Sequence, residues 1–248
     1  MPQIWFYTFL SLAVVSALSF VGALALTLGN DRLKKVLLYL VSFSAGALLG
    51  DVFLHLFPEM QKSGFGQREG FYILGGILIF FIFEKFIHWH HSHTEHEEEI
   101  HAVVYLAIAG DALHNFIDGL IIAGSFLVSP ALGVATTLAV IFHEIPHELG
   151  NFAVLVHGGW TAKKALLYNF FSSFAAFLGG IVVLILSSGQ SSQPTILLAL
   201  GASNFIYVAL SDLVPEIHKE TDKEKSWFLL LSFFLGMVVM ASLLFLEK

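Results

Sequence analysis

The chain has 248 residues, of which 56% are hydrophobic and only 12% are charged. Soluble domains carry about 25% charged residues, so this composition argues against a soluble enzyme, a disordered chain and a nucleic-acid-binding protein. The formal net charge of -7 identifies no partner, because several acids cluster in one loop, and the absence of cysteine excludes disulfides, thiolate metal ligands and thiol nucleophiles. The sequence therefore predicts an all-α integral membrane protein.

Eight apolar runs of about 20 residues or more predict eight transmembrane helices within a single transporter domain, residues 1–248. The first run lacks a basic leader and a small-residue cleavage site, so we keep it as a span. In chain order the runs cover residues 4–28, 36–58, 70–88, 101–128, 131–156, 160–187, 194–216 and 226–246.

The basic residues predict the orientation, because cytoplasmic connections are enriched in Lys and Arg. With the N-terminus outside, only Lys62, Arg68 and Lys248 lie outside, and the other nine basic residues lie inside. These nine are Arg32, Lys34, Lys35, Lys85, Lys163, Lys164, Lys219, Lys223 and Lys225. The expected topology is N-out and C-out.

Two segments resemble each other. ALLGDVFLHLFPE (47–59) ends the second span and NFIYVALSDLVPE (204–216) ends the seventh, and both close with a polar residue, two apolar residues and Pro-Glu. They run in opposite directions in the expected topology. This predicts a 3+2+3 arrangement with an inverted repeat, as in many secondary transporters, although so short a match also arises by chance.

Ionisable side chains are concentrated in the middle of the fourth and fifth spans, where each is a functional hypothesis. Spacings of four residues place them in stripes, and the short turn at Ser129-Pro130 makes the two spans antiparallel neighbours. Imidazole and carboxylate groups suit Zn, and also Fe, Mn, Co or Ni. The alternative is a structural hydrogen-bond network. The residues are Asp111, His114, Asn115, Asp118, His143, Glu144, His147 and Glu148.

Pro146 lies between the fifth-span ligands. A proline inside a helix removes one backbone hydrogen bond and predicts a kink, which frees the carbonyl of Phe142 to contact or hydrate an ion.

Two further groups of polar residues lie near span ends, and we interpret them as stations along a transport path. Asp51, His55 and Glu59 lie towards the outer end of the second span. Asp212, Glu216 and His218 lie towards the inner end of the seventh. The alternative is ordinary interfacial residues that end a helix.

A His/Glu-rich cytosolic loop, residues 89–100, connects the third and fourth spans. Such tracts hold divalent ions weakly and reversibly, so the loop is either a site of metal capture or a solvated linker. The candidate ligands in and beside it are His88, His90, His91, His93 and His96.

HNFIDG (114–119) followed by HEIPHELG (143–150) resembles the ZIP family of divalent-metal transporters, in particular the subfamily with HExPHE in the fifth span. The resemblance implies that His114, Asp118, His143 and His147 hold the metal. Asn115 and Glu144, again with Asp118 and His147, would border a second metal position. The chain departs from the family in its sixth span, where Ala176 and Phe177 replace an acidic residue and a proline; Glu148 or Asn169 are candidates to compensate.

The predicted function is uptake of Zn²⁺, with Fe²⁺, Mn²⁺ and Cd²⁺ as other candidates, by alternating access. The metal is substrate, and no organic cofactor is expected. The expected partners are metal ions and the bilayer, with a homodimer open and nucleic acid not expected; a prokaryotic inner membrane is the expected location. The rival is a membrane-embedded zinc protease, in which HEIPH (143–147) and Asp118 bind Zn and Glu144 is the base. A metal-gated channel is a third class.

Overall fold

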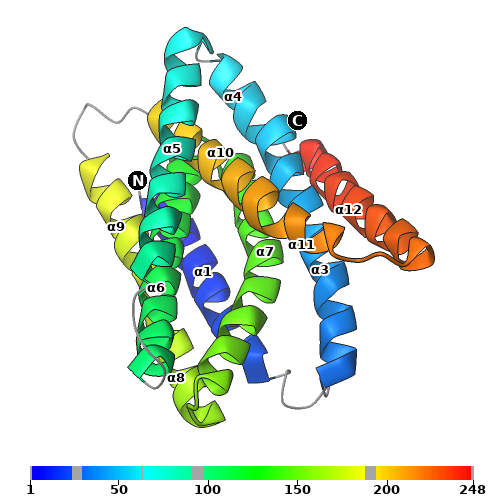
Figure 1. Ribbon diagram of the computed structural model, residues 1–248. Coiled ribbons are helices and arrows are strands. Elements are labelled where there is room, and N and C mark those ends of the chain that lie inside the picture. The colour runs from blue at the N-terminus through cyan, green and yellow to red at the C-terminus, as the bar shows by residue number, and fades with distance from the viewer. Residues whose placement is uncertain (1, 24–29, 63, 91–97, 188–193, 247–248) are drawn as a thin grey trace.

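The computed structural model describes residues 2–23, 30–62, 64–90, 98–187 and 194–246, and all regular structure within these ranges is helical (Figure 1). This confirms the all-α prediction. The first half contains α1 (Pro2–Ala17), η1 (Leu18–Val21), α3 (Asn30–Asp51), η2 (Val52–Leu56), α4 (Phe57–Lys62), α5 (Gln67–His90) and α6 (Glu98–Val128). The second half contains α7 (Pro130–His157), α8 (Ala162–Ser173), α9 (Ala175–Leu186), α10 (Pro194–Tyr207), η3 (Val208–Leu213), α11 (Val214–His218), α12 (Lys223–Leu243) and η4 (Leu244–Leu246).

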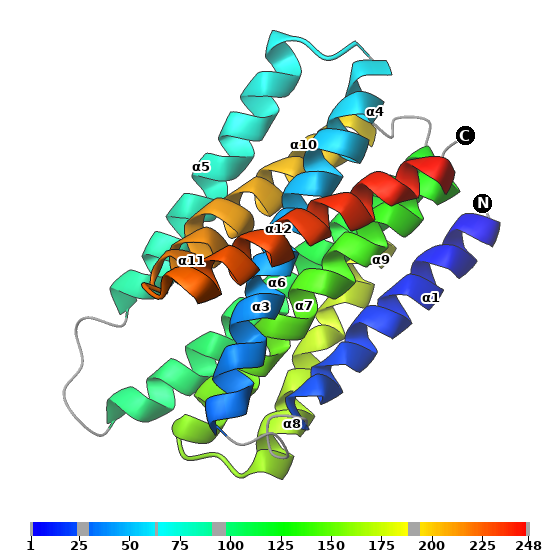
Figure 2. The same ribbon diagram turned by 90° about the vertical axis from the view of Figure 1, so that its right-hand side faces the viewer.

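The helices form one bundle, with α1 and α5 on opposite sides and α6 and α7 between them (Figure 2). α1 begins and α12 ends at the same end of this bundle (Figure 2). Six helical segments among the described residues are long and apolar enough to cross a membrane. They are Pro2–Val21, Val36–Lys62, Ala107–Val128, Ala162–Leu186, Thr195–His218 and Lys223–Leu243. The remaining two predicted spans correspond to α5 and α7.

The predicted sixth span, 160–187, is one apolar run in sequence but two helices in the structure, because α8 and α9 meet at Phe174. The predicted turn between the fourth and fifth spans is confirmed. α6 ends at Val128 and α7 begins at Pro130, with Ser129 as N-cap accepting a hydrogen bond from the Leu132 N–H at 3.1 Å. α6 and α7 are therefore adjacent and antiparallel.

The two segments that resemble each other share an unusual backbone feature. Each contains a π-helical turn, η2 in one and η3 in the other, separated by one residue from its Pro-Glu pair. The Phe57 N–H bonds to the Val52 carbonyl five residues earlier, and the Val214 N–H bonds to the Ala209 carbonyl at the same spacing. π turns commonly occur at functional sites. These two contain His55 and Asp212, which are both candidate path residues.

Glycine permits very close contact in two helix pairs. A Cβ added at Gly46 of α3 would lie 1.9 Å from the Phe233 carbonyl oxygen of α12, and one at Gly236 would lie 2.1 Å from that of Phe43. In the α6/α9 pair, Cβ atoms at Gly119 and Gly179 would lie 1.9 and 2.0 Å from the carbonyl oxygens of the facing helix. Small residues allow such backbone contact in membrane helices. The contact with α9 holds α6 in place, and α6 carries part of the candidate site.

Candidate metal centre

Four side chains from α6 and α7 converge between these helices. His114, Asp118, His143 and Glu144 each offer a ligand atom, and all four atoms lie within 4.8 Å of one another. The His143 Nε2 atom lies 3.2 Å from Asp118 Oδ2 and 3.4 Å from Glu144 Oε1. The His114 Nε2 atom lies 3.2 Å from Glu144 Oε1 and 3.7 Å from Asp118 Oδ2. We call these four residues the central group.

The backbone of α7 orients the His143 ring. The Nδ1–H of His143 donates to the Ala139 carbonyl at 3.2 Å, because a carbonyl can only accept. Nε2 therefore presents a lone pair to the central group, only 3.1 Å from Nε2 of His114. Ligating histidines are commonly oriented by such a bond from the other ring nitrogen.

The carboxylates of the central group are buried without donors. Asp118 and Glu144 are 0% exposed, and both oxygens of each lack a hydrogen-bond partner. α6 and α7 contain no Lys or Arg that could neutralise them. Buried carboxylates without compensation are costly, so acceptors arranged in this way fit a divalent cation.

His147, the fourth metal ligand by family resemblance, lies beside the central group. Its ring stacks on that of His114 with centroids 4.4 Å apart. Its Nδ1 atom lies 3.8 Å from Glu144 Oε1 and 3.6 Å from Asp111 Oδ1. With its side chain 34% exposed, His147 is the most accessible histidine of the cluster.

A second polar cluster adjoins His147 and joins α8 to α6 and α7. Asp111 accepts hydrogen bonds from Asn151 Nδ2 at 2.5 Å and from Ser172 Oγ. Asn115 Nδ2 also points to Asp111, which leaves the buried Asn115 Oδ1 without a partner. Glu148 accepts a bond from Asn169 Nδ2, and its other oxygen has no partner. Sequence reasoning missed Asn151 and Ser172 because no motif marks them.

The Phe142 carbonyl, which loses its backbone donor at Pro146, accepts a side-chain hydrogen bond instead. α7 continues through Pro146, and the Phe142 carbonyl accepts a hydrogen bond from Ser44 Oγ of α3 at 2.5 Å. The same hydroxyl lies 2.7 Å from the Leu40 carbonyl, so its one proton is shared and Ser44 replaces the lost backbone donor in part. This corrects the expectation that the carbonyl is free to contact an ion.

The candidate outer residues lie on successive turns of α3, η2 and α4, apart from the central group. Asp51 is buried, and the Thr136 hydroxyl of α7 points to its Oδ2 at 3.4 Å. His55 is buried against α12, with Nε2 2.9 Å from the Met240 carbonyl. Glu59 pairs with Lys62 at 2.6 Å.

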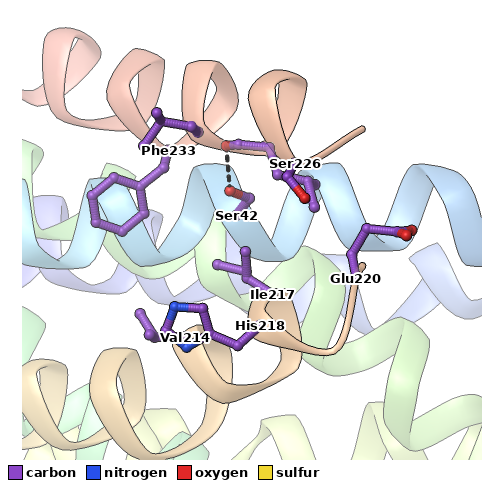
Figure 3. Close-up of a pocket in the computed structure, with 9 residues that line it drawn as sticks. Ser42, Val214, Ile217, His218, Glu220, Ser226 and Phe233 are labelled. Atoms are coloured by element: carbon purple, nitrogen blue, oxygen red, sulfur yellow. Dashed lines mark hydrogen bonds between the residues drawn. The ribbon is translucent and has the colours of Figure 1, made fainter. Parts of the chain in front are cut away.

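The candidate inner residues lie at the end of α10, η3 and α11. Asp212 lies on η3, and Glu216 pairs with Lys219 at 2.5 Å. His218 lines a pocket of about 440 Å³ between α3, α11 and α12, where Ser42 Oγ donates to the Leu229 carbonyl at 2.6 Å (Figure 3). No residue of the central group lines this pocket.

The His/Glu-rich loop is largely outside the described residues. α5 extends to His90 and α6 begins at Glu98, so helix enters both ends of the predicted loop range. His91, His93 and His96 lie outside the described residues. Metal capture by the loop, with His88 and His90 at its start, stays a prediction.

Comparison with known proteins gives a consistent result. The model of the ZIP zinc transporter family matches residues 3–103 and 88–244. Zinc transporter ZIP13 of Pongo abelii is 34% identical over 81% of this chain and 65% of its own length, and zinc transporter YKE4 of Saccharomyces cerevisiae is 33% identical over 86% and 72%. Zinc transporter ZIP4 of Rattus norvegicus is 32% identical over 80% of this chain. The chain spans only 41% of the rat protein.

Proposed function

Because the chain belongs to the ZIP zinc transporter family, we propose that it carries divalent metal ions, Zn²⁺ first, into the cytoplasm by alternating access. The observation that carries this proposal is the central group, whose imidazoles and donor-free buried carboxylates fit a cation in the middle of two helices. Fe²⁺, Mn²⁺ and Cd²⁺ are further candidates for the same ligands.

The proposed first-bound ion is held by His114, Asp118, His143 and Glu144, with His147 beside it. The buried amide oxygen of Asn115, next to His114 in the chain, has no hydrogen-bond partner. Because the amide of Asn115 carries no charge, a second metal position near Asn115 should bind an ion more weakly than the central group does. We therefore propose one tight Zn²⁺ per chain at the central group.

The proposed membrane architecture is a single domain of eight spans, N-out and C-out, in a 3+2+3 inverted repeat. The matching π turns of η2 and η3 support the repeat, as does the opposite direction of the two segments (Figure 2). Asp51, His55 and Glu59 would form the outer path, and Asp212, Glu216 and His218 the inner path. A π turn adds one residue to a helical turn, so it would change the direction in which the side chains in and after it point.

The proposal is for a carrier and not an enzyme. The relatives matched over most of the chain are named zinc transporters, which gives no support to the protease alternative. A channel with a metal gate would not need metal ligands as deeply buried as Asp118, His143 and Glu144. A prokaryotic inner membrane and a homodimer remain parts of the proposal, and the relatives reported above are eukaryotic.

The proposal is tested with purified protein in sealed liposomes that contain a metal-sensitive dye. We expect saturable uptake of Zn²⁺, measured in parallel with Fe²⁺, Mn²⁺ and Cd²⁺. Asp118→Ala should abolish uptake because it removes a central carboxylate. His157→Ala, which changes an exposed histidine at the end of the same α7, is the matched control and should not. Equal uptake by Asp118→Ala and the unaltered chain would contradict the proposal.

A further inference from the structure

We propose that a sodium ion binds between α3, α6 and α7, on the side of the central group that the expected topology places outside. Its ligands are oxygen atoms of Asp51, Ser125 and Thr136, which we call the outer oxygen group. All three residues are 0% exposed. Sodium is a second ion, distinct from the cargo, so this inference goes beyond the function proposed above.

The spacing along α6 and α7 places Ser125 and Thr136 on the helix faces that carry the central group. Ser125 follows Asp118 by seven residues, and Thr136 precedes His143 by seven. Seven residues are about two helical turns, so the two residues of each helix share a face. The side chains of Asp118 and His143 meet at 3.2 Å on these antiparallel helices. Ser125 and Thr136 therefore repeat that pairing about two turns nearer the α6/α7 turn.

Both hydroxyl groups have an oxygen to offer a cation. Ser125 Oγ is buried and has no hydrogen-bond partner. The Thr136 hydroxyl points to Asp51 Oδ2 at 3.4 Å, which is longer than the usual O–H···O distance of about 2.7–2.8 Å. Burying a hydroxyl without a partner costs free energy. A cation among these oxygens gives the Ser125 hydroxyl a partner and joins it to the carboxylate of Asp51.

A layer of apolar side chains separates the outer oxygen group from the central group. On each of α6 and α7, buried apolar residues lie in the chain between the residue of one group and the residue of the other. They are Ile121 and Ile122 of α6 and Ala139 and Val140 of α7. The outer oxygen group is therefore a separate site and not an extension of the central group.

The ligand atoms favour a small monovalent cation over Zn²⁺. All three are oxygen atoms, which hard cations prefer, whereas Zn²⁺ in proteins is bound mainly through nitrogen and sulfur. The imidazole of His55, one turn along from Asp51, is held by α12, with Nε2 2.9 Å from the Met240 carbonyl. The group has one carboxylate, whose charge balances a monovalent ion but not a divalent one. Sodium is smaller than potassium, so it suits a group with no exposed surface.

Sodium in this position links three helices. Asp51 belongs to α3, whereas Ser125 belongs to α6 and Thr136 to α7. The ion therefore stabilises the arrangement in which Asp51 is buried against α7. An ion that binds the folded chain and not the unfolded chain raises the thermal stability as its concentration increases.

Thermal unfolding of the purified chain in detergent measures this binding, with a chelator present to keep divalent metals away from the central group. At constant total salt, the unfolding midpoint should rise and saturate as NaCl replaces choline chloride, and KCl should give a smaller rise. Ser125→Ala and Thr136→Val should each raise the half-saturating Na⁺ concentration at least about tenfold, as loss of a supporting group does at other metal sites. Thr137→Val is the matched control and should keep the response, because the Thr137 hydroxyl bonds to the Gly133 carbonyl at 2.6 Å.

Equal rises with NaCl and KCl would overturn the sodium site, as would the same Na⁺ response in Thr136→Val and Thr137→Val. If Thr136→Val does not fold, Ser125→Ala decides the question, since it removes one hydroxyl only. Failure of the proposed function has a different signature. A chain that keeps the Na⁺ response but takes up no divalent cation would contradict the carrier and retain the sodium site, whereas Zn²⁺ uptake by a chain without a Na⁺ response would contradict the sodium site alone.

Discussion

The bond from His143 to the Ala139 carbonyl determines which ring nitrogen faces the other ligands. Because Nε2 of His143 meets Nε2 of His114 and two carboxylates, every atom at the centre of the group can act as an acceptor. Single-residue changes here should therefore affect metal affinity before they affect folding.

His143→Ala should lower Zn²⁺ affinity by at least about 100-fold, because it removes a direct ligand and even supporting partners contribute 10 to 100-fold. Glu144→Gln keeps one oxygen atom that can bind the metal, so uptake should be slower but measurable. In a protease that used Glu144 as its general base, the same change would abolish activity. Titration against a competing chelator measures the affinity. His157→Ala, which changes an exposed histidine at the end of α7, is the control, and equal loss in the control would contradict the assignment.

Ser44→Ala should destabilise the chain by about 1–3 kcal/mol, the typical cost of an unsatisfied buried polar group. Its hydroxyl is the donor that the Phe142 carbonyl has in place of the missing Pro146 N–H. In a Pro146→Ala background the backbone donor returns, so the same change should cost less. Thermal unfolding in detergent of all four variants measures this coupling, and additive effects would show that the two donors are independent.

At the scale of helices, close packing sets where the metal ligands lie. The contact between Gly119 and Gly179 brings α6 against α9, and Gly119 directly follows the ligand Asp118. A side chain in this contact has to push the helices apart, since the nearest atoms are backbone.

Gly179→Ala should destabilise the chain by more than about 1–3 kcal/mol, the usual range for overpacking. Its Cβ would lie 2.0 Å from the Phe116 carbonyl oxygen. Gly75→Ala is the control, because a Cβ at this α5 position meets nothing within 4 Å and should stabilise the helix by about 0.5–1 kcal/mol. The loss of monodisperse protein on heating in detergent measures both, and equal stability of the two variants would contradict the packing analysis.

At the scale of the whole molecule, orientation decides whether transport is uptake or export. The chain contains no cysteine, so single cysteines can be labelled without background. Gln61→Cys in α4 and Lys163→Cys in α8 replace exposed residues at predicted opposite faces of the membrane.

An impermeant thiol reagent added to intact cells should label Gln61→Cys, whereas Lys163→Cys should react only after the membrane is opened. The physical basis is the excess of Lys and Arg in the predicted inner connections. Detergent-solubilised protein, in which both sites should react, is the control for exposure. The reverse labelling pattern would overturn both the N-out topology and the uptake direction.

The sequence by itself determined the helical membrane class, the approximate extent of the apolar runs and the pairing of polar stripes on α6 and α7. Hydropathy and four-residue spacing are local properties of the chain, so they can be read from the sequence without knowing how the helices pack. The specific spacing of HNFIDG and HEIPHELG also carried the family resemblance.

Only the tertiary structure decided which polar residues meet. It brings Glu144 into the four converging ligands and leaves His147 beside them, because small rotations of packed helices choose among neighbours on one face. The break at Phe174 and the docking of α8 bring Ser172 to Asp111, and α3 supplies Ser44 to the Phe142 carbonyl. These contacts join residues far apart in the chain, and no local pattern encodes them.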